Sequence, residues 1–218
     1  MKKKNIHILW MALTVCVSGC NDLDEVVYSG VTEQTYSYSV NDFIPNIAGA
    51  YEPLHGDFVG GYWQTQELTG CCVVTPPNST GWDDGGIYKR LHFHNWNSEL
   101  GQISSLWNNY FNGAIERLEK DIIPSPSPEK KQQGISELRT LRAYYYWILM
   151  DNFGDIPLVT TMSQELPGKT ARAQVYDFIV KELGEAIPDL AEEQDASTYG
   201  KLNKWAGKAI LANVYLNA

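Results

Sequence analysis

Basic residues are scarce in this sequence. Its 218 residues include 17 Lys and Arg against 26 Asp and Glu, which gives a formal net charge of −9. A surface of this charge repels phosphate backbones, so we expect no nucleic-acid partner. The hydrophobic fraction of 44% and the aromatic fraction of 12% are typical of a globular chain, so the acidic balance does not indicate disorder.

Cysteine is also rare, with four residues in all. Cys16 and Cys20 lie in the first twenty residues, which leaves only the adjacent pair Cys71 and Cys72. A disulfide between neighbours closes a small strained ring, so we expect free thiols or a labile bond there. These few thiols exclude a cysteine-rich zinc site.

The N-terminal residues have the pattern of a targeting signal. Three lysines at residues 2–4 precede an apolar run over residues 6–17. This run is shorter than the ~20 residues that cross a bilayer, so we predict a signal peptide over residues 1–19. Small residues directly before Cys20 form a lipobox, which predicts an acylated Cys20 as the mature N-terminus. An ordinary secretory signal is the alternative.

Residues 21–25, which read NDLDE, are acidic. They resemble the export signal that sends some bacterial lipoproteins to the cell surface. A solvated tether is the alternative interpretation. Acyl chains on Cys20 hold a protein firmly on a bilayer when two or more are present. We therefore expect a lipid-anchored outer-membrane protein that faces the cell surface.

Helical periodicity dominates the rest of the chain, which we treat as one domain over residues 20–218. The predicted helices cover about residues 41–54, 104–121, 128–153 and 173–190, and a fifth begins near residue 203. The fifth reaches Ala218 in mid-pattern, so we expect an incomplete domain with an exposed stripe of Ile210, Val214 and Leu216.

The third predicted helix has the clearest end signals. Ser127 is a suitable N-cap with Pro128 at the first helical position, and Gly154 follows the last turn. Arg139 and Arg142, three residues apart, are expected to pair with acids on a neighbouring helix. In the first helix we expect Asn41 to be the cap and to see a buried stripe of Ile44, Ile47 and Tyr51.

The predicted fold class is mainly α, with helical hairpins like those of tetratricopeptide repeats (TPR-like), long loops and a few short strands. The strand candidates are residues 72–75 and 88–93. His92 and His94 would share a face of the second strand, but no third ligand is evident, so we expect no metal site.

Residues 55–101 form a loop-rich segment that concentrates tryptophan, glycine and short polar residues. A saccharide site needs flat aromatic rings beside carboxylates or amides. The segment supplies both, and its candidate ligand-binding residues are Trp63, Trp82, Asp83, Asp84, Trp96 and Asn97. The alternative is that these tryptophans only anchor the loops to the helical core.

Catalytic patterns are absent from the sequence. Asp83 and Asp84 are adjacent, whereas glycosidase carboxylates face each other across a substrate, and Asp84 with Gly85 reads as a turn. No Ser-His-Asp order, phosphate loop or nucleotide fingerprint occurs. We therefore predict a binding protein with no catalytic residues and no cofactor.

Several motifs together resemble one family. Residues 138–146 read LRTLRAYYY and residues 153–159 read FGDIPLV. Further along, residues 199–206 read YGKLNKWA and residues 211–216 read LANVYL. With Gly49-Ala50-Tyr51, and with WDDGG and LHFH in the loop-rich segment, they resemble, in order, the N-terminal region of SusD/RagB-like outer-membrane lipoproteins.

This resemblance implies a surface lipoprotein that captures nutrient glycans and delivers them to a SusC-like TonB-dependent transporter. Two alternatives remain at this point. One is a receptor of the same fold for peptides or another nutrient, and the other is a TPR-type assembly scaffold without a small ligand. Solvent-exposed tryptophans would favour the glycan receptor.

Overall fold

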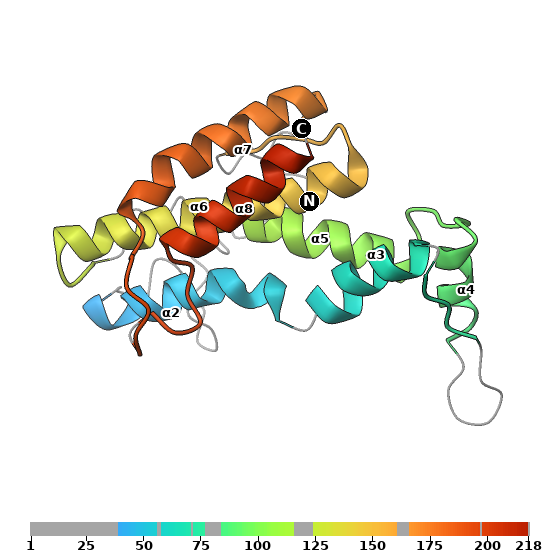
Figure 1. Cartoon of the computed structure of the whole chain (residues 1–218), viewed down its shortest axis with the longest axis horizontal. Helices are drawn as coiled ribbons and strands as arrows, with labels where there is room; N and C mark the ends of the chain where they lie inside the picture. Colours follow the sequence, from blue (N-terminus) through green and yellow to red (C-terminus); the bar gives the residue numbers. More distant parts are fainter. Residues whose placement is uncertain are drawn as a thin grey trace, which may run out of the picture. The chain divides into compact units, whose positions relative to one another are not determined.

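The structure is a computed structural model, and the part of the chain that it describes is mainly helical (Figure 1). It describes residues 39–55, 58–70, 72–76, 84–115, 124–160, 166–196 and 198–217. All of them belong to the second of the two units into which the chain divides, Tyr38–Ala218. Cys20, the predicted signal peptide, Cys71, Trp82 and Asp83 lie outside the described residues.

The helical elements are α-helices, labelled α, and short 3₁₀- or π-helical segments, labelled η. In chain order they are η1 (Val40–Asp42), α2 (Phe43–Ala48), η2 (Gly49–Leu54), η3 (Phe58–Trp63), α3 (Gln64–Thr69), α4 (Ile87–His92), α5 (Gly101–Ile115), α6 (Pro128–Phe153), α7 (Arg172–Ala186), η4 (Ile187–Asp189) and α8 (Lys204–Leu216). The predicted mainly helical class is confirmed.

The long helix α6 begins and ends where the sequence predicts. Ser127 is extended and its hydroxyl accepts a hydrogen bond from the backbone N–H of Lys130 at 3.2 Å, with Pro128 in the first turn. Gly154 ends the helix with a φ of 72°, a conformation that favours glycine. Local capping chemistry therefore sets both ends of the longest element.

Helix α6 is the centre of the main core, because α5, α7 and α8 all contact it. α6, α7 and α8 run in alternating directions, as the TPR-like prediction requires (Figure 1). The largest buried side chains are Tyr110 of α5, Tyr145, Tyr146, Leu141 and Ile148 of α6, and Ile179 and Leu183 of α7. Leu141, Tyr145 and Ile148 thus mark the side of α6 that forms the core.

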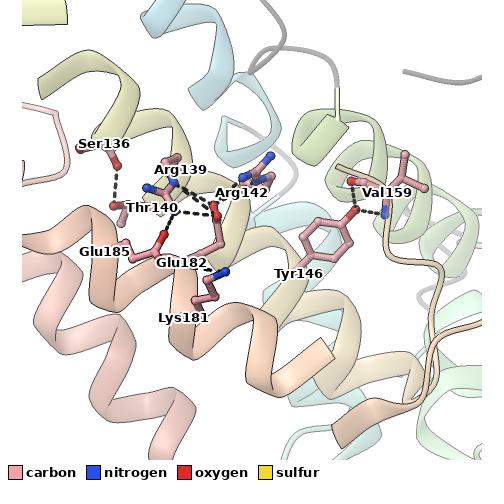
Figure 2. A network of polar contacts seen from close by, with 9 residues as sticks. All are labelled: Ser136, Arg139, Thr140, Arg142, Tyr146, Val159, Lys181, Glu182 and Glu185. Carbon is pink, nitrogen blue, oxygen red and sulfur yellow. Dashed lines mark hydrogen bonds and ion pairs between the residues drawn. The ribbon is translucent and has the colours of Figure 1, made fainter. Parts of the chain in front are cut away.

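Helix α7 is joined to α6 by a network of ion pairs as well as by apolar packing (Figure 2). Arg139 Nη2 lies 2.9 Å from Glu182 Oε1 and 2.6 Å from Glu185 Oε2, and Arg142 Nη2 lies 2.6 Å from Glu182 Oε2. Burial raises the pKa of Glu182, but hydrogen bonds from Arg139 and Arg142 outweigh it and lower the pKa below its ordinary value. The predicted interhelix pairing is confirmed.

The connection between α6 and α7 is also tied down at one side chain. The Tyr146 hydroxyl accepts a hydrogen bond from Val159 N at 2.9 Å and donates one to Val159 O at 2.6 Å (Figure 2). Ile156 and Thr170 form an isolated antiparallel bridge nearby. These bonds fix residues 156–160 against the core without a sheet.

Several local predictions are wrong. Ser39, not Asn41, caps the first helical segment, through a capping box with Asp42. Ile44 is 58% exposed, because α2 turns Ile47 rather than Ile44 toward α6. Val214 is fully buried, so it does not belong to an exposed stripe with Leu216.

The predicted strands are not found among the described residues. Residues 87–92 form helix α4, and the described residues 72–76 have no regular structure. His92 therefore closes a helix while His94 lies in the following turn, so the two do not alternate along a strand. In the described part of the chain, His, Cys, Asp and Glu side chains form no group of three or more that could hold a metal ion.

The remaining helices differ from prediction mainly at their ends. α5 begins at Gly101, and the predicted continuation to residue 121 lies outside the described residues. α7 ends at Ala186 and continues as η4, where Pro188 falls. Among the described helices, none is both long and apolar enough to span a membrane.

Candidate functional site

The loop-rich segment is supported by a small core of its own. Leu68 of α3, Leu91 of α4 and Leu100 are buried together, with Ile87, Tyr88 and Ile103 packed around them. We call residues 63–69 and 84–100 with this core the α4 region. Helices α3 and α4 contact each other, so the exposed residues that follow α4 are held against α3.

Trp96 is the most clearly positioned of the predicted aromatic residues. Its side chain is 41% exposed, and its ring meets the ring of His94 edge-to-face at 5.2 Å between centroids. His94 Nε2 in turn lies 2.8 Å from the carbonyl oxygen of Thr69 at the end of α3. The exposed tryptophan therefore rests on a side chain that is itself fixed.

The backbone at His94 is unusual. Its φ of 54° is in the left-handed region, and it is the one non-glycine residue with positive φ in the described part of the chain. Such conformations cost of order 1 kcal/mol or more and persist where the surroundings impose them. Here the bend turns the chain after α4, so that residues 94–97 lie beside that helix.

Arg90 links this bend to the predicted amide. Its Nε donates a hydrogen bond to the carbonyl oxygen of Asn95 at 3.1 Å, and its Nη2 lies 3.5 Å from Oδ1 of Asn97. All three residues are exposed. The guanidinium and the Asn97 amide thus offer hydrogen-bonding groups close together, and the exposed Trp96 is the residue directly before Asn97.

Asp84, another of the predicted site residues, has a structural role at the start of α4. Its carboxylate accepts hydrogen bonds from Gly86 N at 3.0 Å and from Tyr88 N at 2.8 Å, and so caps α4. The N–H of Tyr88 and then that of Gly86 lower the pKa of the Asp84 carboxyl, which keeps it ionised. The predicted Asp84 turn is confirmed, with Gly85 and Gly86 both at positive φ.

Trp63 lies apart from Trp96 along α3. It is 49% exposed and directly precedes α3, whereas the contact with His94 is at Thr69, the last residue of α3. Six residues of helix separate these ends by about 9 Å. The structure therefore brings Trp96 and Asn97 together, places Trp63 at the far end of α3, and leaves Trp82 and Asp83 outside the described residues.

Arg90 and the bend at His94 are features that sequence reasoning missed. The signal was present in residues 90–97, RLHFHNWN, where basic and amide side chains stand between apolar and aromatic ones. We missed it because the same residues were predicted to form a strand. The left-handed turn at His94 depends on a contact with α3 that the sequence does not show. Phe93, at 65% exposure, adds a further ring to the same loop.

A sequence comparison decides the family. The profile of the SusD-like family described as "Starch-binding associating with outer membrane" matches residues 72–216, more than half of the chain. The protein belongs to the SusD-like family. Starch-binding protein SusD of Bacteroides thetaiotaomicron is 27% identical to this SusD-like chain over 249 residues, covering 100% of the chain and 42% of SusD. A SusD-like protein of Bacteroides ovatus is 30% identical over 125 residues, covering 52% of the chain and 22% of the relative.

Solved structures agree on the fold. A laminarin-binding SusD-like protein superposes with a TM-score of 0.70 at 22% identity, over 83% of this chain and 40% of the other. Surface glycan-binding protein A of Bacteroides thetaiotaomicron, in complex with laminarihexaose, gives a TM-score of 0.66 at 18% identity, over 81% and 39%. This SusD-like chain thus spans about two fifths of the length of SusD and of these structures.

Proposed function

We propose that this SusD-like protein captures nutrient glycans at the outer membrane and delivers them to a SusC-like TonB-dependent transporter. The observation that carries the glycan part is the exposed Trp96 ring, held by His94 in the same short loop as Asn97, whose amide Arg90 contacts. A sugar ring has an apolar C–H face that stacks on an aromatic ring and hydroxyl groups that exchange hydrogen bonds with amides and guanidinium groups.

Three kinds of support point the same way. The family description includes starch binding and the outer membrane. One similar structure is of a protein that binds laminarin, and another is a complex with laminarihexaose. The α4 region presents its rings from short segments on a helical base, an arrangement that suits a binding surface on a scaffold.

The anchor and the remaining candidate residues belong to the same proposal. Acylation of Cys20, after removal of residues 1–19, attaches the helical domain to the outer membrane. Trp82 and Asp83 extend the glycan surface on the chain that precedes α4, and Trp63 extends it along α3. Glycan capture in this proposal is binding without chemistry at the site.

The test is calorimetric titration of the purified protein with laminarihexaose and with a linear starch oligosaccharide. We expect at least one to bind, and Trp96→Ala to weaken that binding by about 1–3 kcal/mol, the scale of an aromatic face withdrawn from water. Asn97→Ala should weaken it less, because a single hydrogen bond contributes about 1 kcal/mol.

Trp205→Ala is the matched control. Trp205 is 51% exposed on α8, and its Nε1 donates a hydrogen bond to the Glu192 carbonyl at 3.2 Å. It is thus a similarly exposed tryptophan on a different helix, and its loss should leave glycan affinity unchanged. If the folded protein binds neither oligosaccharide, or if Trp96→Ala binds as well as Trp205→Ala does, this assignment of the site is wrong.

A further inference from the structure

A recess lies between α2, α6 and the chain that leads into α8. It has a volume of about 600 Å³, within the usual range of small-molecule sites. Its walls include the apolar side chains of Phe43, Ile47, Leu190 and Leu202. We call this recess the α2–α6 cleft.

A buried carboxylate stands in the wall of the cleft. Glu137 of α6 is only 8% exposed, and its Oε1 accepts a hydrogen bond from the Tyr51 hydroxyl. Its burial raises the pKa of Glu137 above the ordinary value, against the lowering effects of the Tyr51 bond and the charge of Lys201. The carboxylate is therefore poorly solvated where it lies.

The other oxygen of this carboxylate has no hydrogen-bond partner among the described residues. Among the described residues, no hydrogen-bond donor reaches Glu137 Oε2 and no lysine or arginine forms an ion pair with Glu137. Of the two lysines of the cleft wall, Lys130 Nζ donates to Gln133 Oε1 at 3.0 Å, and the exposed Lys201 acts on Glu137 through its charge without forming an ion pair with it. An anion in such a place gains strongly from a cationic donor.

The cleft is built into the fold. Helix α2 lies so close to α6 that a Cβ on Gly134 would be 2.7 Å from Ile47 Cδ1 and 2.8 Å from Phe43 Cζ. On the opposite wall, the backbone N–H of Leu202 donates to the Tyr51 hydroxyl at 2.8 Å. The side chain that holds Glu137 is thus itself held by the chain before α8, so both walls are fixed before a ligand arrives.

We propose that the α2–α6 cleft binds an organic ammonium ion, a primary amine on an apolar body, with the ammonium group on Glu137 Oε2 and the body against Phe43, Ile47 and Leu190. The net charge of −9 adds a general attraction for cations. This ligand class differs from the neutral glycans of the proposed function, and neither Trp96 nor Asn97 lines the cleft. The two sites are therefore separable by experiment.

The probe is para-fluorophenethylamine, followed by fluorine NMR during titration of the purified protein. Its neutral analogue, para-fluorophenethyl alcohol, has the same ring and chain without the charge. We expect the amine to bind at least about tenfold more tightly than the alcohol, the effect of one charge-assisted hydrogen bond in a poorly solvated site. Glu137→Gln keeps the acceptor for Tyr51 and should remove this preference.

Two further variants serve as controls for this interpretation. Ala48→Trp places a ring into the cleft from an exposed position of α2, so it should abolish binding of the amine while Glu137 remains. Glu99→Gln removes the same charge from an exposed site in the α4 region and should change nothing. Thermal melts by circular dichroism establish that each variant is folded.

The proposal is overturned if the folded wild type does not bind the amine, if the alcohol binds equally well, or if Glu137→Gln keeps the preference for the amine. Glycan titrations on Glu137→Gln separate this outcome from the proposed function. Glycan affinity should be the same as in the wild type, whatever happens in the α2–α6 cleft.

Discussion

The α6–α7–α8 scaffold and the α4 region use the same kinds of side chains on very different scales. In the scaffold, a long capped helix is buried along one side by three neighbours and is tied to α7 by Glu182 and two arginines. In the α4 region, three leucines form the buried centre under short helices of six residues. Burial of apolar area scales with size, so the second region depends on the first for its stability.

The comparison extends to backbone strain and exposure. The α4 region contains the left-handed His94 and three exposed large rings, those of Trp63, Phe93 and Trp96. The scaffold hides Tyr145, Tyr146 and Leu141 completely. Strain and exposed rings in the α4 region lower stability there only, because a small region can open locally while the scaffold stays folded.

The largest expected difference comes from the same truncation made once in each core. Leu141 and Leu91 are both fully buried leucines, one on α6 and one on α4. Leu141→Ala should lower the free energy of global unfolding by about 2–5 kcal/mol, because it leaves a cavity in the main core. Leu91→Ala should instead lower the free energy of local opening of the α4 region, with a smaller effect on the global melt.

Hydrogen exchange measured residue by residue distinguishes these effects from one another. Leu91→Ala should speed exchange in α3 and α4 and leave α6 protected, whereas Leu141→Ala should reduce protection throughout. Equal loss of protection in both regions for Leu91→Ala would mean that the two cores unfold as one unit, and the comparison would fail.

A middle-sized effect is expected at the interhelix network. Glu182→Gln leaves Arg139 and Arg142 partly buried without their shared carboxylate, which should cost about 3 kcal/mol at pH 7. Urea denaturation at pH 7 measures this difference. The Glu137→Gln variant is the control, since Glu137 is as buried but forms no ion pair among the described residues, and we expect it to cost little or to stabilise the protein.

The two glutamates should also differ in the sign of their pH dependence. The folded-state pKa of Glu182 is lowered, so its contribution is present above its unfolded pKa and is lost as the pH falls through the folded value. The folded-state pKa of Glu137 is raised, so its contribution is present below its unfolded pKa and is lost as the pH rises through the folded value. Stability curves of the two variants from acid to neutral pH should therefore diverge from the wild type in opposite directions.

The smallest effect concerns the start of α6. Ser127→Ala removes the hydroxyl that accepts from Lys130 N and should cost about 1 kcal/mol in the melt. Ser127→Asp restores an acceptor at the same place and should recover most of the loss. A melt unchanged by Ser127→Ala would show that tertiary packing, rather than the cap, fixes this end of the helix.

The same contrast explains what could be predicted from the sequence. The bounds of α6 depend on local signals, Ser127, Pro128 and Gly154, and on a periodic pattern long enough to be unambiguous. The pairing of the two arginines was predictable because a spacing of three residues places both side chains on one face of the helix. Local chemistry and tertiary structure agree in the scaffold.

In the α4 region the deciding interactions are not local. The residues of α4 also suit a strand, and the choice is made by the Asp84 cap together with burial of Leu91 against α3 and Leu100. The turn at His94 depends on Thr69, 25 residues earlier. Trp96 and Asn97 could be named from composition, but the contacts of Arg90 with Asn95 and Asn97 could not, because they exist only after that turn forms.

The Tyr51 hydroxyl has a consequence for the order in which the molecule can assemble. It donates a hydrogen bond to Glu137 and accepts one from the backbone N–H of Leu202. Leu202 lies 151 residues after Tyr51 in the chain. Closing so long a loop costs entropy that early folding steps cannot recover, so contacts of this separation form late. During synthesis, the Tyr51 hydroxyl of η2 therefore cannot accept its hydrogen bond from Leu202 until 151 further residues have emerged.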